Sequence, residues 1–535
     1  MSPCFIGIDV GTGSVRAGIF DGQGNKLAAA SRPIQTWRPE AFHAEQSSRD
    51  IWMAICDAVK EAMQLAGLEA DAIAGIGFDA TCSLVVLDAQ GNPVAVNADG
   101  EDERNIILWM DQRARAEAEE INATQARVLD YVGGRISPEM ETPKILWLAR
   151  HLPSALERAA HFFDLADFLT FKATGSLTRS TCTLTCKWTY LAHEQRWDRD
   201  YFETIGLGAL ASDDFARIGT EVADPGTALA KGLTPTAAAE LGLNPGIAVG
   251  VGMIDAHAGA IGTLGAEGLP GEVGNRLAYV FGTSACTLNV TEEPIFVPGV
   301  WGPYHAALLP GLWLNEGGQS AAGAAIDYLV RSHPFAPEAQ NRADAAGMGL
   351  TQWLETRAQL MLDGASPAQT IAGIHVVPEF LGNRAPFADP DARAIVAGLG
   401  LEGDEDSLVR LYIAGIVSIG YGLRQILAAL ADKGVEITSV VISGGAARSR
   451  LVRRLLADAA DIAVATVITD EPVLLGSAML GAMAAGQAPD LRTAMGGMSR
   501  ADEIIEPTES DRSAHVRRLA TFHNLQAAYR AMRDH

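Results

Sequence analysis

The sequence predicts an α/β protein made of two large domains. Short apolar runs that suit buried strands alternate along the chain with segments of helical spacing, which is typical of sheets covered by helices. The chain has 535 residues, too many for a single hydrophobic core. A turn of glycine and hydroxyl residues between two apolar strands occurs at 5–20 and again at 276–290. This repeat predicts that each half of the chain opens with a related unit.

Composition and charge indicate a soluble globular protein. Hydrophobic residues make up 48% of the chain and charged residues 20%. The formal net charge is −24, from 65 acidic and 41 basic residues, which argues against binding to nucleic acid or to a membrane. Because no targeting segment and no apolar run of about 18 residues is found, we expect a cytoplasmic location. The six cysteines are scattered without a CxxC pair, which predicts reduced thiols and no zinc site.

The first repeat, FIGIDVGTGSVRAGIF at 5–20, predicts a β-hairpin with a phosphate-binding turn. Gly11, Thr12 and Gly13 lie between the strands, where glycine leaves backbone N–H groups open to an anion. Asp9 ends the first strand, and its carboxylate would repel a phosphate unless a divalent cation lay between them, which indicates Mg²⁺. An ordinary glycine-rich hairpin is the alternative. A dinucleotide-binding fold is disfavoured because no helix follows the turn.

The elements after this hairpin continue the alternation of strands and helices. We predict strands at 26–34, 73–78 and 84–87 and a helix at 47–67 that ends at its glycine. Thr81, Cys82 and Ser83 form a polar turn with Asp79 at the end of a strand, where α/β sheets usually bind ligands. A plain connecting loop is the alternative for this turn.

Two charged segments follow in the first half. In WMDQRARAEAEEINA, at 109–123, Asp111 and Arg113 precede an acidic helix, so Asp111 would either cap that helix or bind sugar hydroxyls together with Arg113. A further helix is predicted at 143–150. Lys187 is a single cation among small and aromatic residues, and most such lysines lie at the surface.

The segment AVGVGMIDAHAGAIG, at 248–262, is the second centre of chemical interest. An apolar strand ends before Asp255, which stands at the start of a helix rich in alanine and glycine. Asp255 is therefore a candidate catalytic carboxylate or, alternatively, the N-cap of the helix, and packing or capping is the favoured role of His257. The glycine-rich segment at 262–275 is the candidate domain boundary.

The second half opens with RLAYVFGTSACTLNV, at 276–290, which predicts a strand, a Gly-Thr-Ser turn and a second strand. Two facing turns of this kind could hold the two ends of one polyphosphate. Glu316 and Gln319 are expected at the start of a helix of small residues. The remaining predicted elements are a long apolar helix at 409–430, a strand, Gly-Gly turn and helix at 439–460, and a helix from about 510 onward.

These motifs, in this order, resemble those of the FGGY family of carbohydrate kinases over nearly the whole chain. They are DVGTGSVRAG (9–18), WMDQRA (109–114), GMIDAHAG (252–259), FGTSAC (281–286), EGGQSAAG (316–323), NRAPFADPDARA (383–394) and SGGAARS (443–449). The resemblance implies two actin-like, ribonuclease H-like ATPase domains, 1–265 and 266–535, with nucleotide and sugar in the cleft between them. The segment at 394–410 departs from the family's second signature in its downstream spacing.

Carried over to this sequence, the resemblance implies a kinase that uses ATP and Mg²⁺. Asp255 matches the family's general base, and Asp9 would position the metal. The implied nucleotide-binding residues are Gly11, Thr12, Gly13, Arg16, Gly282, Thr283, Gly444, Gly445 and Ala446. The run TCSLV at 81–85 resembles the marker of the D-ribulokinase branch of the pentulose kinases. The implied sugar contacts are Thr81, Cys82, Ser83, Asp111, Arg113, Lys187 and Glu316.

The expected reaction is phosphorylation of the terminal hydroxyl of D-ribulose, giving D-ribulose 5-phosphate. Xylulose, L-ribulose, ribitol, erythritol and glycerol are the alternative substrates. A non-enzymatic ATPase switch of the actin or chaperone type shares the two turns but does not account for WMDQRA or TCSLV. At its reference pKa of about 3.9, Asp255 would be ionised at pH 7. The expected partners are ATP and a small sugar, and the sequence is compatible with a homodimer.

Overall fold

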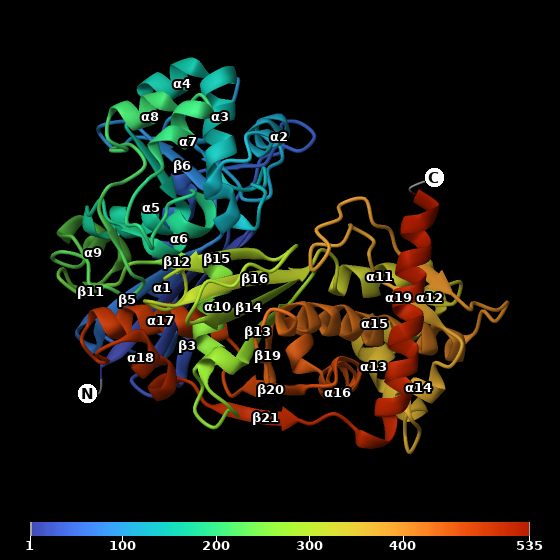
Figure 1. Ribbon diagram of the computed structural model, residues 1–535. Coiled ribbons are helices and arrows are strands. Elements are labelled where there is room, and N and C mark those ends of the chain that lie inside the picture. The colour runs from blue at the N-terminus through green and yellow to red at the C-terminus, as the bar shows by residue number, and fades with distance from the viewer. Residues whose placement is uncertain (1–2, 534–535) are drawn as a thin grey trace.

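The computed structural model describes residues 3–533. The main sheet of the first half has six strands in the order β11–β5–β1–β2–β3, with β12 also paired with β5. Its strands are β1 (Cys4–Val10), β2 (Ser14–Asp21), β3 (Lys26–Pro33), β5 (Ile73–Ala80), β11 (Ala248–Val249) and β12 (Met253–Ile254). Figure 1 shows these strands beside helices α1 (Ser48–Ala66) and α9 (Pro235–Leu241).

The predicted hairpin at 5–20 is confirmed. Strands β1 and β2 pair antiparallel with Asp9 opposite Arg16, and β3 continues the sheet. The predicted helix at 47–67 is also confirmed, and its ends follow capping rules: Ser47 accepts a hydrogen bond from the Asp50 N–H group, and Gly67 takes a φ of 64°. Local sequence signals therefore determine both elements.

Parallel pairing brings three strand ends to one edge of this sheet. Asp9 on β1 lies opposite Asp79 on β5, and Asp79 lies opposite Met253 on β12. Helix α10 (Asp255–Leu264) begins directly after β12. The carboxylates of Asp9, Asp79 and Asp255 consequently belong to neighbouring strand ends, the usual place of a ligand site in α/β sheets.

A second layer stands on top of the first sheet, drawn in blue and teal at the upper left of Figure 1. Its four-stranded sheet has the order β4–β7–β6–β8, and β9 pairs with β10. The strands are β4 (Glu45–Gln46), β6 (Leu84–Leu87), β7 (Ile106–Ile107), β8 (His161–Asp164), β9 (Arg179–Ser180) and β10 (Val222–Ala223). The helices are α2 (Arg115–Ala123), α3 (Glu141–His151), α4 (Pro153–Arg158), α5 (Leu165–Thr174), α6 (Thr181–Lys187), α7 (Arg199–Thr204) and α8 (Gly208–Ser212).

The second half contains a seven-stranded sheet in the order β15–β16–β14–β13–β19–β20–β21. Its strands are β13 (Arg276–Phe281), β14 (Ala285–Thr291), β15 (Trp301–His305), β16 (Trp313–Gln319), β19 (Ser439–Ser443), β20 (Ala463–Val467) and β21 (Ala501–Ile505). A separate pair is formed by β17 (His375–Val377) and β18 (Ile395–Ala397). The antiparallel pair β13–β14 around Gly282–Ser284 confirms the predicted second hairpin.

Helices surround this second sheet on the right of Figure 1. They are α11 (Gly323–Ser332), α12 (Ala336–Ala345), α13 (Leu350–Met361), α14 (Pro367–Thr370), α15 (Glu405–Ala431), α16 (Arg450–Ala460) and α19 (Arg512–Arg533). Helix α15 is long and apolar enough to cross a membrane by length and composition, but 67% of its most apolar window is buried. Helix α15 is therefore a core helix of the second half.

Helices α10 and α17 (Pro472–Ala484) join the two halves. Helix α17 comes from the second half of the sequence but packs on β1 and β5, and Figure 1 shows it with α18 (Leu491–Met498) beside the N-terminal strands. Helix α17 approaches these strands closely. A Cβ on Gly7 would lie 1.9 Å from the Leu474 carbonyl oxygen, and a Cβ on Gly77 would lie 1.9 Å from the Ser477 carbonyl oxygen. Only glycine fits at these strand positions.

One predicted element is wrong. Glu316 and Gln319 lie in strand β16, and the helix begins only at Gly323. Strand β16 pairs with β14 on one side and β15 on the other, so sheet hydrogen bonding outweighs the helical preference of the small residues that follow. The division of the chain at 265/266 stays a prediction.

Candidate active site

The turn of the first hairpin is open to solvent and has room for an anion. The Gly11 N–H group donates to the Ser14 carbonyl at 3.0 Å, and the Gly13 carbonyl accepts from the Ile34 N–H group at 3.2 Å. Gly13 is exposed, and a Cβ added there would meet no atom within 4 Å. These features fit a phosphate cradle.

The turn of the second hairpin lies beside the Gly-Gly loop. Strands β13 and β19 are parallel neighbours, so the turn at Gly282 and the loop at Gly444 follow adjacent strand ends. Gly444 has a φ of 86°, and a Cβ there would lie 2.5 Å from the Phe281 carbonyl oxygen. Gly282, Thr283, Gly444 and Gly445 are exposed and Ala446 is half-buried. The loop geometry thus requires glycine and leaves its surface accessible.

A cavity of about 270 Å³ lies between helices α11, α13 and α15. Asp327, Tyr412 and Leu354 are among the residues that line it. The residue after Leu354 is Glu355, whose carboxylate accepts a hydrogen bond of 2.6 Å from Ser449, close to the Gly-Gly loop in sequence. This hydrogen bond links helix α13, which lines the cavity, to the segment that follows the Gly-Gly loop.

Three carboxyl groups shape the electrostatics of the strand-end edge. Burial and the neighbouring Asp9 raise the pKa of Asp79 well above its usual range, while a hydrogen bond from Ser477 opposes this. Burial and the charge of Asp9 also raise the pKa of Asp255, to about 6, although the Ala256 N–H group, His257 and Lys187 act in the opposite direction. The expectation of an ordinary pKa for Asp255 is therefore wrong, because its environment disfavours the charged form.

Asp255 is the first residue of α10 rather than its cap. Ile254 holds the N-cap position, and the Asp255 Oδ1 atom accepts a hydrogen bond of 2.7 Å from the Ala256 N–H group. Asp255 is only partly covered, so its carboxylate is available to a ligand. The capping interpretation of Asp255 is thus wrong.

Asp9 and Asp79 offer oxygen donors of the kind that Mg²⁺ prefers. The Asp79 Oδ1 atom is buried without a hydrogen-bond partner among the described residues. Within residues 3–533, no three carboxylate, histidine or cysteine side chains are close enough to enclose an ion on their own. The residues present fit a Mg²⁺ ion that keeps most of its water ligands, as this ion usually does.

Arg16 links the first turn to the second half of the sequence. Its guanidinium group contacts the Asp9 carboxylate across the hairpin and donates to Glu471 at 2.6 Å. Glu471 is the residue before α17. Arg16, one of the residues implied to bind nucleotide, is therefore held between two carboxylates near the phosphate turn.

The polar turn at 81–83 is connected to the phosphate turn by Trp109. The Thr81 and Ser83 hydroxyls lie 3.1 Å apart, and Ser83 Oγ also accepts from the Trp109 N–H group at 3.1 Å. The Trp109 indole nitrogen donates to Thr12 Oγ1 at 3.0 Å. Ser83 is fully buried, whereas Thr81 and Cys82 keep a small accessible surface.

Asp111 and Arg113 form a buried ion pair. Arg113 lies 2.7 Å from Asp111 and 3.0 Å from Glu45, and the Asp111 carboxylate also accepts a hydrogen bond of 2.6 Å from the Ala44 N–H group. The N-cap of α2 is Ala114, so the interpretation of Asp111 as a helix cap is wrong. The pair instead fixes the loop that carries the WMDQRA motif.

Lys187 and Glu316 meet around Trp301. The Lys187 ammonium group lies 4.8 Å from the centre of the Trp301 ring, and the Arg384 guanidinium group lies 4.5 Å from it. Arg384 also forms an ion pair with Glu316. Burial raises the pKa of Glu316, but Lys187, His257 and Arg384 outweigh burial and hold it well below its usual range. Lys187 is buried, so its interpretation as a surface lysine is wrong.

The structure thus brings several of the predicted residues together in two neighbouring regions, while the turn at Gly282 and the loop at Gly444 follow adjacent strands of the second sheet. Strand ends of the first half carry Asp9, the phosphate turn and Asp255, whereas Lys187 and Glu316 meet between α6 and β16. Sequence analysis did not identify Trp301, Arg384 or Glu471. Arg384 lies inside the NRAPFADPDARA motif, which is a usable signal, but no local pattern singles out the other two residues.

Comparisons with known proteins show the family to which the chain belongs. The family models for the N-terminal and C-terminal domains of the FGGY family of carbohydrate kinases match residues 4–262 and 277–485. A human FGGY carbohydrate kinase domain-containing protein is 44% identical over 531 residues, covering 97% of this chain and 96% of that protein. A D-ribulokinase from Saccharomyces cerevisiae is 38% identical over 512 residues, covering 90% of this chain and 72% of that protein.

The fold also matches solved structures. A xylulose kinase from Lactobacillus acidophilus superposes with a TM-score of 0.81 at 19% identity, covering 99% of both chains. This structural similarity supports the predicted actin-like architecture. The family models show which family the chain belongs to. The chain is therefore a member of the FGGY family of carbohydrate kinases and a sugar kinase.

Proposed function

We propose that the protein transfers the terminal phosphoryl group of ATP to the terminal hydroxyl of D-ribulose, giving D-ribulose 5-phosphate. The observation that carries the proposal is the position of Asp255, a partly accessible carboxylate at the same sheet edge as Asp9. The exposed turns at Gly13 and Gly282 supply backbone N–H groups for phosphates. The TCSLV run at 81–85 and the similarity to the yeast D-ribulokinase support the choice of D-ribulose as the substrate.

In this mechanism Asp255 orients the terminal hydroxyl of the sugar and accepts its proton as the oxygen attacks phosphorus. In phosphoryl transfer, alignment and charge neutralisation supply most of the rate enhancement. The N–H groups of the two turns would hold the phosphate oxygens in line with the sugar. Mg²⁺, which Asp9 would hold through water, neutralises phosphate charge when it is bound.

Selection of D-ribulose over D-xylulose requires the recognition of one hydroxyl, because the two sugars differ only in configuration at C3. A site that hydrogen-bonds one orientation leaves buried polar groups unpaired with the other, at a cost of about 1 to 3 kcal/mol per group. Thr81, Lys187 and Glu316 supply the polar groups proposed to do this. We propose that Asp111 and Arg113 support the loop beside them.

The test is a coupled ATP assay on purified protein with D-ribulose, D-xylulose, L-ribulose, ribitol, erythritol and glycerol. The proposal expects the highest kcat/KM for D-ribulose and a product phosphorylated on O5, identified by NMR. A higher kcat/KM for another member of the panel would reject D-ribulose and leave the kinase assignment intact. The cytoplasmic location and the homodimer stay predictions.

A further inference from the structure

His257 is a fully buried side chain that connects the two halves beside the candidate base. It lies on α10, two residues after Asp255, and none of its surface is accessible. Its Nδ1 atom is 2.9 Å from the sulfur of Cys182 on α6. Its Nε2 atom is 3.6 Å from Glu316 Oε2 on β16, which is an ion-pair distance rather than a hydrogen bond. One imidazole therefore faces a thiol on helix α6 of the first half and a carboxylate on strand β16 of the second half.

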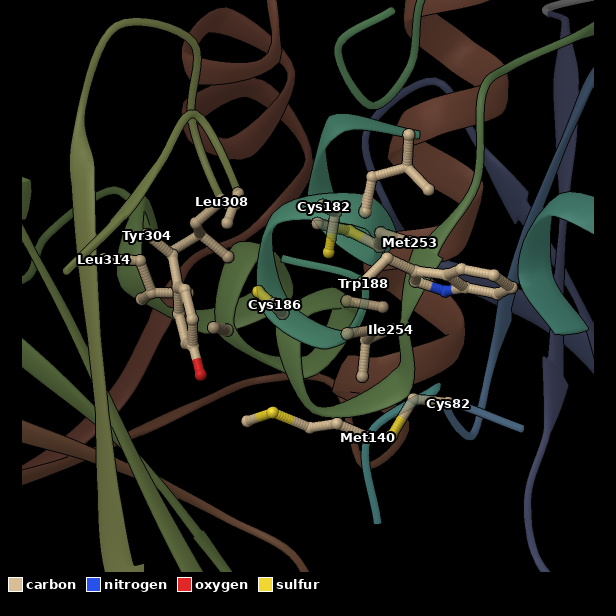
Figure 2. Close-up of a cluster of buried hydrophobic side chains, with 14 of the residues drawn as sticks. Cys82, Met140, Cys182, Cys186, Trp188, Met253, Ile254, Tyr304, Leu308 and Leu314 are labelled. Atoms are coloured by element: carbon tan, nitrogen blue, oxygen red, sulfur yellow. The ribbon is translucent and has the colours of Figure 1, made fainter. Parts of the chain in front are cut away.

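Cys182, His257 and Glu316 shift one another's pKa values toward the charged forms. Burial would lower the pKa of His257, but the Cys182 sulfur and Glu316 raise it to about 9. Burial would raise the pKa of Cys182, but hydrogen bonding with Cys186 and the charge of His257 lower it to about 5. Figure 2 shows Cys182 and Cys186 on the same helix, α6. The Cys182 sulfur and Glu316 thus favour the protonated imidazole, and the positive charge of His257 in turn favours ionised forms of both neighbours.

The accessible surfaces show which of these groups can meet a ligand. The Glu316 side chain is 7% accessible and that of His257 is 0% accessible. The two carboxylate oxygens of Glu316 have different partners: Oε1 contacts Arg384, and Oε2 faces His257. A sugar would therefore meet Glu316, with His257 behind it as the group that fixes the rotation of the carboxylate.

We infer that His257 is a positioning residue for the sugar: held at Nδ1 by Cys182, it presents Nε2 to Glu316 and fixes that carboxylate for sugar binding. The inference rests on the proposed function, because it assumes that Glu316 contacts the sugar. It differs from the packing or capping role that the sequence favours. A packing residue needs only its volume, whereas this role needs a donor at the Nε2 position.

Two substitutions separate these roles. In H257N the amide nitrogen can occupy the place of Nδ1 and reach Cys182, but nothing remains at the place of Nε2. In H257Q the longer amide can occupy the place of Nε2 and reach Glu316, but it loses the contact with Cys182. Both variants remove the positive charge, so the pair differs mainly in which neighbour keeps a donor.

The measurement is the KM for the preferred sugar and the KM for ATP, with thermal melting as a check on folding. H257N should raise the sugar KM by about 10- to 100-fold, because the buried Glu316 Oε2 atom then loses the charged group that faces it. H257Q should recover most of that loss, and the ATP KM should change by less than about threefold in both variants. Equal sugar KM values for the two variants, or a parallel rise in the ATP KM, would overturn the inference.

A second pair of variants tests the contact between Cys182 and His257, and it covers the case in which H257N folds poorly. C182A leaves the His257 Nδ1 atom without its partner, whereas C182S keeps a hydrogen-bonding atom there. The sugar KM should rise in C182A and return toward the wild-type value in C182S. No difference between C182A and C182S would also contradict the inference. A wild-type protein inactive on the whole sugar panel would instead overturn the proposed function and this inference with it.

Discussion

At the scale of single residues, the surroundings of Asp255 make its carboxylate a better base but lower the stability of the folded protein at neutral pH. Burial and the nearby Asp9 raise its pKa to about 6, so the carboxylate is a stronger base than an ordinary aspartate. It is still ionised above pH 7. The same burial disfavours the charged form in the folded protein, which makes this residue a cost to the fold at neutral pH.

Asp255→Asn should lower kcat by about 100-fold or more, because the amide keeps the shape of the side chain but cannot accept the proton. The KM values for ATP and sugar should change little. In the wild type, kcat/KM should fall as the pH drops below about 6, since the base becomes protonated. Asp57→Asn, at an exposed aspartate on α1, is the matched control. Near-normal kcat at saturating substrate would remove Asp255 from the mechanism.

The same substitution should increase stability at pH 7.5. The folded pKa of Asp255 lies above the unfolded value of 3.8, so its favourable contribution is complete below about pH 4 and is lost as the pH rises through 6. Asn cannot ionise, so it should gain about 1 to 3 kcal/mol over the wild type at pH 7.5, at about 1.4 kcal/mol per pKa unit. Denaturation at pH 4.5 and 7.5 measures the difference. A gain that does not depend on pH would contradict this cause.

At the scale of elements, the first hairpin turn and the Gly-Gly loop present exposed backbone without a side chain. Gly13 and Gly445 have no atom within 4 Å of an added Cβ, and both are exposed. Gly7 and Gly77 are different, because an added Cβ on either would collide with the backbone of α17. The protein itself therefore requires glycine at the packed positions, whereas at Gly13 and Gly445 only a bound ligand would require it.

Gly13→Ala should raise the KM for ATP by about tenfold while the melting temperature stays within about a degree of the wild-type value. The added methyl group meets no protein atom but would occupy the proposed phosphate cradle. Gly497→Ala, at an exposed position in α18 that also has open space, is the control and should leave the KM for ATP unchanged. An unchanged KM for ATP in Gly13→Ala would mean that the first turn does not hold the nucleotide.

At the scale of the whole molecule, charged contacts and shared helices tie the halves together. Arg16 contacts Glu471 at 2.6 Å, and Lys26 contacts Asp470 at 2.5 Å, so the first hairpin and strand β3 are both bound to the segment that precedes α17. Both pairs are partly exposed and contribute little stability on their own. The packing of α17 on β1 and β5 makes the larger contribution.

The purified protein should hydrolyse ATP without sugar at no more than about a hundredth of its rate with sugar. A base beside ATP would otherwise activate water, and closure of the two halves on bound sugar is the usual way to prevent this. The measurement is ADP release with and without the preferred sugar, together with the radius of gyration from X-ray scattering. ADP release that does not respond to any sugar of the panel would favour an ATPase switch instead.

Local sequence patterns are enough to predict many of the secondary-structure elements and the family. The two hairpins, the helix at 47–67 with its Ser47 and Gly67 caps, and the tail helix follow from periodicity, capping residues and turn glycines, which act over a few residues. The FGGY motifs are short local patterns as well, so their order along the chain was enough to indicate a carbohydrate kinase.

Interactions between residues far apart in the chain could not be predicted in this way, because they depend on tertiary packing. Glu316 was expected in a helix but lies in β16, because pairing with β14 and β15 outweighs local propensity. The pKa of Asp255 is raised by burial and by Asp9, and the pKa of His257 is raised by Cys182 and Glu316. Charge and burial act through space over a few ångströms, so these properties arise when residues far apart in the chain are packed together.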